Sequence, residues 1–202
     1  MKGDLSKYIP EGAIAGVQEL LSHDNLLVKV KRKRKTKHGD YRKLSDGSHL
    51  ITVNDSRNPY RFLMTLIHEI AHFKVSIHYM RKVKPHGNEW KMTFQKLMLP
   101  FINPEIYPSH LLPLLAKHFK NPKASSNSDH QLFYELKQYD PPNNKQFVFE
   151  IDESTEFIAQ NGRQYKRGKK RVKRIECWEI STGRLWLFNP NAEVELLDKK
   201  NL

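Results

Sequence analysis

The sequence predicts an α+β protein, with helices and a small β-sheet in its first part and a small antiparallel β-rich unit at its carboxyl end. Apolar residues recur at helical spacing in several segments before residue 120, and two short apolar runs there are typical of strands. After residue 146, strand-like runs alternate with turn glycines. The polar segment 121–129 between these regions is typical of a loop. We therefore expect a first domain over residues 1–120, a linker with a short helix over 121–145 and a β-rich unit over 146–202.

Apolar spacing and turn residues define the elements of the first domain. Ile14, Val17, Leu20 and Leu21 form an apolar stripe that predicts a helix over residues 10–21. Two strands follow, separated by a basic segment and a turn around Gly39 and Asp46-Gly47. The strands are predicted over residues 26–30 and 48–53, and later helices over residues 59–79, 88–99 and 111–119.

In the carboxyl-terminal part, the sequence predicts a helical segment over residues 131–139. It then predicts strands over residues 146–151, 156–160, 171–180 and 184–188. Gly162, Gly168 and Gly183 mark the expected turns. Cys177 is the single cysteine, so neither an intrachain disulfide nor a cysteine-rich zinc ribbon can hold this unit together. We expect an aromatic core instead, made of Phe147, Phe149, Phe157, Tyr165, Trp178, Trp186 and Phe188.

The net charge of +13 favours a polyanionic partner, most commonly nucleic acid. Residues 1–120 carry 21 basic and 10 acidic side chains, whereas residues 121–202 carry 14 and 12. Two basic runs predict sequence-independent, electrostatic contacts with DNA, although a solvated cationic surface explains them equally simply. The predicted contact residues are Lys31, Arg32, Lys33, Arg34 and Lys35 in the first run, and Lys169, Lys170, Arg171, Lys173 and Arg174 in the second.

No apolar run approaches the length that spans a membrane, and the first residues lack the apolar core of a secretory signal. With a single cysteine, these observations predict a cytoplasmic protein without membrane contact. The protein would be nucleoid-associated in a bacterium or nuclear in a eukaryote. The sequence leaves the oligomeric state open.

The sequence His68-Glu69-Ile70-Ala71-His72 carries the strongest chemical signal. It falls within a predicted helix, where side chains four residues apart lie one above the other on the same face. Two histidines placed in this way can bind one Zn²⁺ through imidazole nitrogens. The glutamate beside them is positioned to take a proton from a zinc-bound water.

A zinc peptidase normally uses three protein ligands, so a third ligand is required. His78 lies six residues after His72 on the same helix, about 600° of rotation away, and points elsewhere. His86 is the better candidate, because the turn Pro85-His86-Gly87 can return it to the metal. Glu89 remains a weaker alternative and more plausibly supports the site from outside the ligand set.

The motif His68-Glu69-x-x-His72, followed by Pro85-His86-Gly87-x-Glu89-Trp90, resembles the SprT-like zinc metallopeptidase family of SprT and Spartan-type proteases. The resemblance covers about residues 5–120 and includes a strand that ends at Asn54 ahead of the zinc helix. It implies a zincin-like catalytic domain with one Zn²⁺ per chain. The implied ligands are His68, His72 and His86, and Glu69 is the implied general base.

The sequence departs from many members of this family, in which a four-cysteine zinc ribbon follows the catalytic domain. The β-rich unit is therefore either the same hairpin architecture held by apolar residues or an unrelated β-appendage. We expect a metallopeptidase that acts on DNA-associated proteins, as in the repair of DNA–protein crosslinks. The alternative is a basic nucleic-acid-binding protein with a structural or inactive zinc site.

Overall fold

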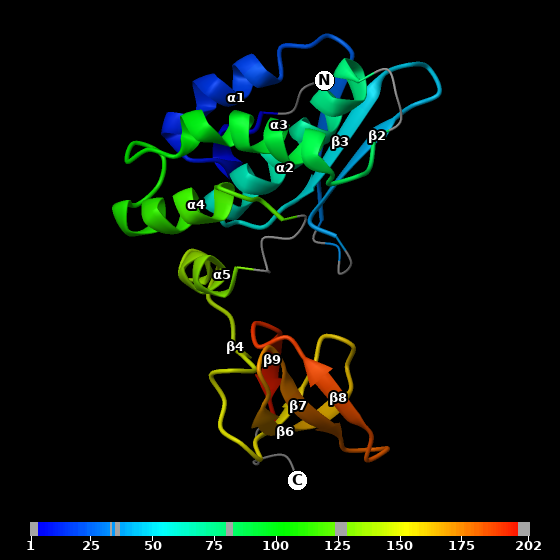
Figure 1. Cartoon of the computed structure of the whole chain (residues 1–202), viewed down its shortest axis with the longest axis vertical. Coiled ribbons are helices and arrows are strands. Elements are labelled where there is room, and N and C mark those ends of the chain that lie inside the picture. Colours follow the sequence, from blue (N-terminus) through cyan, green and yellow to red (C-terminus); the bar gives the residue numbers. More distant parts are fainter. Residues whose placement is uncertain (1–3, 33, 35–36, 80–82, 124–128, 198–202) are drawn as a thin grey trace. The chain divides into compact units, whose positions relative to one another are not determined.

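The computed structural model describes residues 4–32, 34, 37–79, 83–123 and 129–197 (Figure 1). The chain forms two compact units, Met1–Pro141 and Pro142–Leu202. Helices and two small sheets confirm the predicted α+β class. Among the described helices, none is both long and apolar enough to cross a membrane.

A three-stranded sheet lies in the first unit, with strand order β1-β3-β2. The central strand β3 (His49–Asn54) runs parallel to β1 (Leu26–Lys31) and antiparallel to β2 (Gly39–Lys43). Of the turns predicted around Gly39 and Asp46-Gly47, the second connects β2 and β3, whereas Gly39 begins β2 and pairs with Val53. This edge strand has no fully buried side chain, and Tyr41 is its one apolar side chain against the core, so its sequence gives little apolar signal.

The helices of the first unit all overlap segments that the sequence predicted to be helical. The longest, α2, packs against β2, β3 and α3, and many of its side chains are fully buried. Short 3-10 segments precede α1 and α4 and follow α3. The helices are α1 (Ile14–Leu20), α2 (Pro59–His78), α3 (Asn88–Met98), α4 (Leu112–Phe119) and α5 (His130–Lys137), and the 3-10 segments are η1 (Ser6–Tyr8), η2 (Glu11–Ala13), η3 (Leu99–Phe101) and η4 (Ser109–Leu111).

Buried Asn58 joins the start of α2 to α5. Its side-chain oxygen accepts a hydrogen bond from the backbone N–H of Arg61 at 3.1 Å, which caps the helix. Its amide nitrogen donates to the carbonyl of Leu136 at 2.8 Å and to Asp140 at 2.6 Å. Leu132 and Leu136 of α5 belong to the core of the first unit. The first unit therefore extends to Pro141 and includes the short helix that the sequence placed in a linker.

The second unit is a six-stranded antiparallel sheet with strand order β4-β9-β5-β6-β7-β8. The pairing of β6 with β7 shifts register between Arg167 and Lys170, so Gly168 lies inside a strand and the turn predicted there was wrong. The strands are β4 (Lys145–Phe147), β5 (Glu156–Ile158), β6 (Gln164–Lys170), β7 (Ile175–Glu179), β8 (Leu185–Phe188) and β9 (Glu193–Leu196).

The core of the second unit is smaller and less aromatic than predicted. Phe147, Phe157 and Tyr165 are buried, but Trp178 and Trp186 keep 46% and 38% of their surfaces exposed. Phe149 is also exposed. Aliphatic side chains and the thiol fill the centre instead, namely Val148, Ile151, Ile175, Cys177 and Val194.

Candidate metal centre

Helix α2 presents His68 and His72 on one face, one turn apart, with their ring centroids 5.0 Å apart. The neighbouring residues Ile67, Ile70 and Ala71 are fully buried in the core. Core packing on either side of the pair holds both imidazoles in a fixed place, which a metal site requires.

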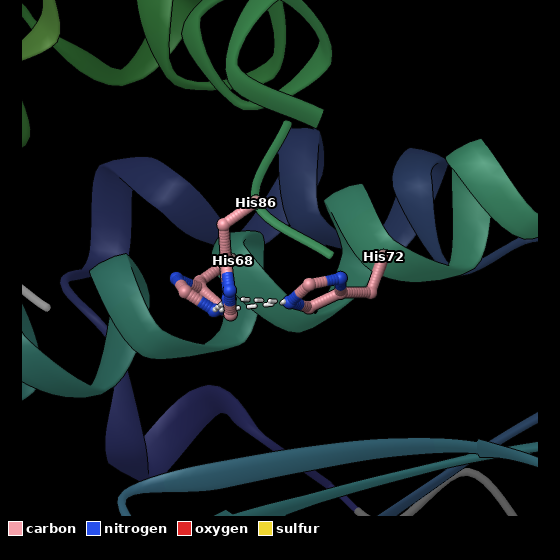
Figure 2. Close-up of side chains that lie close together, drawn as sticks. All are labelled: His68, His72 and His86. Carbon is pink, nitrogen blue, oxygen red and sulfur yellow. Dashed lines mark hydrogen bonds between the residues drawn. The ribbon is translucent and has the colours of Figure 1, made fainter. Parts of the chain in front are cut away.

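His86 reaches the same place from the turn between α2 and α3 (Figure 2). Its backbone is left-handed, with φ of 58°, which is uncommon for a residue other than glycine, although histidine is among those that adopt it. Gly87 follows as the N-cap of α3. This turn directs the imidazole of His86 back toward α2, as predicted from the sequence Pro85-His86-Gly87.

Trp90, in the first turns of α3, forms a common wall behind the three histidines. Its ring centroid lies 4.6, 5.3 and 4.7 Å from those of His68, His72 and His86. Only 1% of Trp90 is exposed. Packing against one rigid indole restricts the orientation of all three imidazoles.

The three Nε2 atoms converge on one point (Figure 2). The separations are 3.2 Å for His68–His72, 3.0 Å for His72–His86 and 3.2 Å for His68–His86. These contacts cannot all be hydrogen bonds, since each Nε2 carries either a proton or a lone pair and at least two of the three must be alike. A cation that accepts three lone pairs resolves the conflict. Zn–N bonds of about 2.0–2.1 Å place the nitrogens of a tetrahedral site about 3.3–3.4 Å apart, close to the observed separations.

The environment keeps these histidines neutral and ready to donate lone pairs. Burial, together with the nearby His72 and His86, lowers the pKa of His68 to about 3. Burial and the nearby His86 lower the pKa of His72 to about 4. Burial also lowers the pKa of His86. The three residues form the single group of histidine, cysteine or acidic side chains in the described residues that could hold a metal ion.

Glu69 lies beside the three histidines and lines the same cavity, which has a volume of about 460 Å³. Only 6% of the residue is exposed. Burial raises its pKa to about 8, with a smaller contribution from the charge of Asp40, while Arg34 and Lys37 act in the opposite direction. A cation held by the histidines would lower this pKa and favour the carboxylate.

Gly39 of β2 leaves room for Glu69. A Cβ atom at this position would overlap Glu69 Oε1 and lie 2.7 Å from its Cγ and 2.9 Å from its Cδ. A side chain at residue 39 would therefore displace the carboxyl group. Sequence reasoning missed this role, because a glycine next to a charged segment is typical of a turn.

Lys37, two residues after the first basic run, lines this cavity. The Nε of Arg34 donates to Asn54 Oδ1 at 2.7 Å, and Asn54 Nδ2 donates to the carbonyl of Lys37 at 2.7 Å. Lys37 Nζ lies 2.8 Å from Asp40 Oδ1. Arg34 thus anchors the segment to β3, whereas Lys31 and Arg32 are exposed. Lys33 and Lys35 lie outside the described residues.

The second basic run lies on β6 and the turn to β7, where all five predicted contact residues are exposed. Arg171 forms an ion pair with Glu176 through its Nε. Lys169, Lys170, Lys173 and Arg174 remain predictions for contact with nucleic acid.

The other candidates for the third ligand lie elsewhere. His78 is exposed in the last turn of α2, and Glu89 lies in the first turn of α3 without joining the histidine group. His118 and Lys123, for which the sequence suggested no role, line the cavity. They come from the region after α3, and no spacing rule connects them to the motif.

The fold and the site together define the class of the protein. It is an α+β domain in which three histidines, on a buried helix and the turn after it, are able to hold a metal ion. Residues 17–109 match the model of the SprT-like family. The predicted resemblance to this family is confirmed over that segment. No curated protein and no solved structure matches the chain.

Proposed function

We propose that this protein is a zinc-dependent metallopeptidase. The observation that carries the proposal is the convergence of three Nε2 atoms within 3.0–3.2 Å of each other in a cavity that Glu69 also lines. Three imidazoles suit zinc, and three protein ligands leave a coordination position for a reactant. The match of residues 17–109 to the model of the SprT-like family supports the same class of activity.

Each residue of the site has a defined task in peptide hydrolysis. His68, His72 and His86 would hold the metal, which as a Lewis acid would lower the pKa of the attacking water and polarise the scissile carbonyl. Glu69 takes a proton from the attacking water and later delivers it to the departing amine. Gly39 and the buried face of α2 keep the Glu69 carboxyl group in place for both transfers.

Metal content tests the ligand set. We expect about one zinc per wild-type chain by elemental mass spectrometry, and a clear loss in His86→Asn. Asparagine is the better replacement than alanine, because it tolerates the left-handed backbone of residue 86. Full retention of zinc by a folded His86→Asn variant would show that another residue completes the site.

Cleavage of casein tests the activity itself. The Glu69→Gln variant should keep its zinc and lose roughly 100-fold or more of the turnover, since it lacks the proton acceptor. Casein cleavage that persists unchanged in this variant, or is missing in zinc-loaded wild type, would contradict the peptidase assignment.

For the substrate class, we propose proteins bound to or attached to DNA. The support is electrostatic. The net charge is +13, Lys37 and Lys123 line the cavity, and the second basic run is exposed on β6 and the following turn. DNA should therefore accelerate cleavage of a DNA-binding protein but not of casein. Equal cleavage of the DNA-binding protein with and without DNA would refute recruitment.

The alternative is a nucleic-acid-binding protein in which zinc is structural. Structural zinc sites are closed by four protein ligands, whereas the described residues supply a group of three beside a cavity. A structural site also has no need for a buried glutamate next to its ligands. The enzymatic role is therefore the better supported of the two.

A further inference from the structure

His118 is a buried histidine in the cavity wall that the proposed mechanism does not use. It lies on α4, its side chain is 4% exposed, and it lines the cavity together with the metal histidines and Glu69. It lies beyond the residues 17–109 that match the family model. A polar ring in this position needs a reason, because burial without a partner costs free energy.

Asp129 provides one partner. Its Oδ2 lies 3.7 Å from His118 Nδ1, and its Oδ1 accepts a hydrogen bond from the backbone N–H of Leu132 at 3.3 Å. Because Asp129 is also the N-cap of α5, its carboxylate is fixed in position. A carboxylate facing Nδ1 favours the tautomer that carries its proton on Nδ1.

The remaining nitrogen, Nε2, then carries a lone pair. Burial lowers the pKa of His118 more than the charge of Asp129 raises it, and Lys123 lowers it further, so the ring is neutral near pH 7. Within the described part of the chain, Nε2 has no hydrogen-bond partner. It is thus an unused acceptor on a residue of the cavity wall.

We propose that His118, held by Asp129, is a substrate-binding residue whose Nε2 accepts a hydrogen bond from a backbone N–H of the polypeptide bound in the cavity. The inference rests on the proposed peptidase function, since it assigns to His118 a contact with the substrate of that peptidase. A bound polypeptide supplies N–H groups that lose water when they enter the cavity, so an acceptor in its wall satisfies one of them. Asp129 is a positioning residue, because it sets which ring nitrogen carries the lone pair.

Binding can be measured without turnover, in the Glu69→Gln variant loaded with zinc. The probe is fluorescein-labelled β-casein, followed by fluorescence anisotropy. Adding His118→Asn should raise the Kd about fivefold or more, because asparagine can replace Nδ1 but does not reach the position of Nε2. Adding His118→Gln should restore much of the affinity, since its longer side chain places an acceptor near Nε2. The matched control is His110→Asn, at an exposed histidine of η4 that does not line the cavity.

Equal zinc content and equal unfolding temperatures in all variants would show that only the contact has changed. A Kd within twofold of the parent in the His118→Asn variant would overturn the inference, as would the absence of casein binding in the parent. Failure of wild type to cleave casein would instead count against the peptidase function, since the binding assay does not depend on cleavage.

A second readout tests the role of Asp129. Long-range ¹⁵N–¹H NMR spectra should show His118 as the Nδ1–H tautomer, the minor form of free histidine. The Asp129→Asn variant keeps the cap of α5 but can donate to Nδ1, so His118 should change to the Nε2–H tautomer and casein binding should weaken. An Nε2–H tautomer in the wild type would overturn the positioning role.

Discussion

His86 illustrates at the scale of one residue how backbone and side chain combine to build the site. Its left-handed conformation carries a cost of about 1–2 kcal/mol for an L-residue, and the surrounding structure must offset that cost. The contact with Trp90 and the position of Gly87 at the start of α3 fix the turn. The turn residues predicted that His86 returns toward His68 and His72, but not the backbone conformation that directs its side chain there.

Glu69 leads to a prediction about protons. Its pKa is raised to about 8, so near pH 6 the metal-free protein keeps the carboxyl group protonated. His68 and His72, with pKa values of about 3 and 4, are already neutral at that pH. Zinc binding lowers the pKa of Glu69 and should therefore release close to one proton.

Calorimetry of zinc binding at pH 6, in buffers with different ionisation enthalpies, measures this release. The Glu69→Gln variant should release about one proton fewer than wild type. A release that is the same in both proteins would mean that Glu69 is already ionised before the metal binds.

Gly39 leads to a second prediction at this scale. In Gly39→Ala, the new methyl group would occupy the position of the Glu69 carboxyl group. We expect a loss of roughly 10–100-fold in kcat for casein, because small displacements of a catalytic group are costly, with little change in zinc content. Lys43→Ala, at an exposed position on the same strand, is the control. Activity in Gly39→Ala equal to that of the control would rule out this steric role.

At the scale of elements, apolar periodicity predicted the helices well, because each buries one side in the core of the first unit. Strands were predicted less well. β2 and β6 (Gln164–Lys170) are mostly polar and each packs a single tyrosine, Tyr41 or Tyr165, against a core, so no apolar alternation reveals them. The contact of His118 with Asp129 was also unpredictable, because it joins two elements whose packing has no local signature.

The exposed lysines of β6 and the turn after it support a prediction on DNA binding. Replacing Lys169, Lys170 and Lys173 with alanine should weaken DNA binding and reduce the slope of log Kobs against log salt by about 0.7–0.9 for each phosphate that the protein no longer neutralises. The control replaces three exposed lysines of the first unit, Lys96, Lys117 and Lys120. Equal weakening in both triple variants would mean that net charge, not this hairpin, governs binding.

At the scale of the whole molecule, the candidate metal site lies entirely within the first unit. This unit has its own core, and its last helix is joined to α2 through Asn58 and Asp140. The second unit has a separate, smaller core. The candidate metal site and the exposed basic hairpin therefore belong to units that can be studied separately.

Two truncations test this division. The fragment 1–141 should fold cooperatively, bind one zinc and cleave casein at close to the rate of the full chain, since it retains the whole first core. The fragment 1–120 lacks α5, which leaves the buried amide of Asn58 without two acceptors and His118 without Asp129. It should unfold at a clearly lower temperature or aggregate. Thermal unfolding followed by circular dichroism distinguishes the two outcomes, and equal stability would place the boundary before α5.

The three converging imidazoles also determine which ions in a cell can compete for the site. Mg²⁺ and Ca²⁺ are hard cations that prefer oxygen ligands, so their abundance gives them little advantage over a trace metal at a nitrogen-only site. Cu²⁺ and Ni²⁺ share the preference for imidazole, and Cu²⁺ binds such ligands more tightly than zinc does. Loading with the correct metal would then depend on how the cell restricts free copper, rather than on selectivity within the protein.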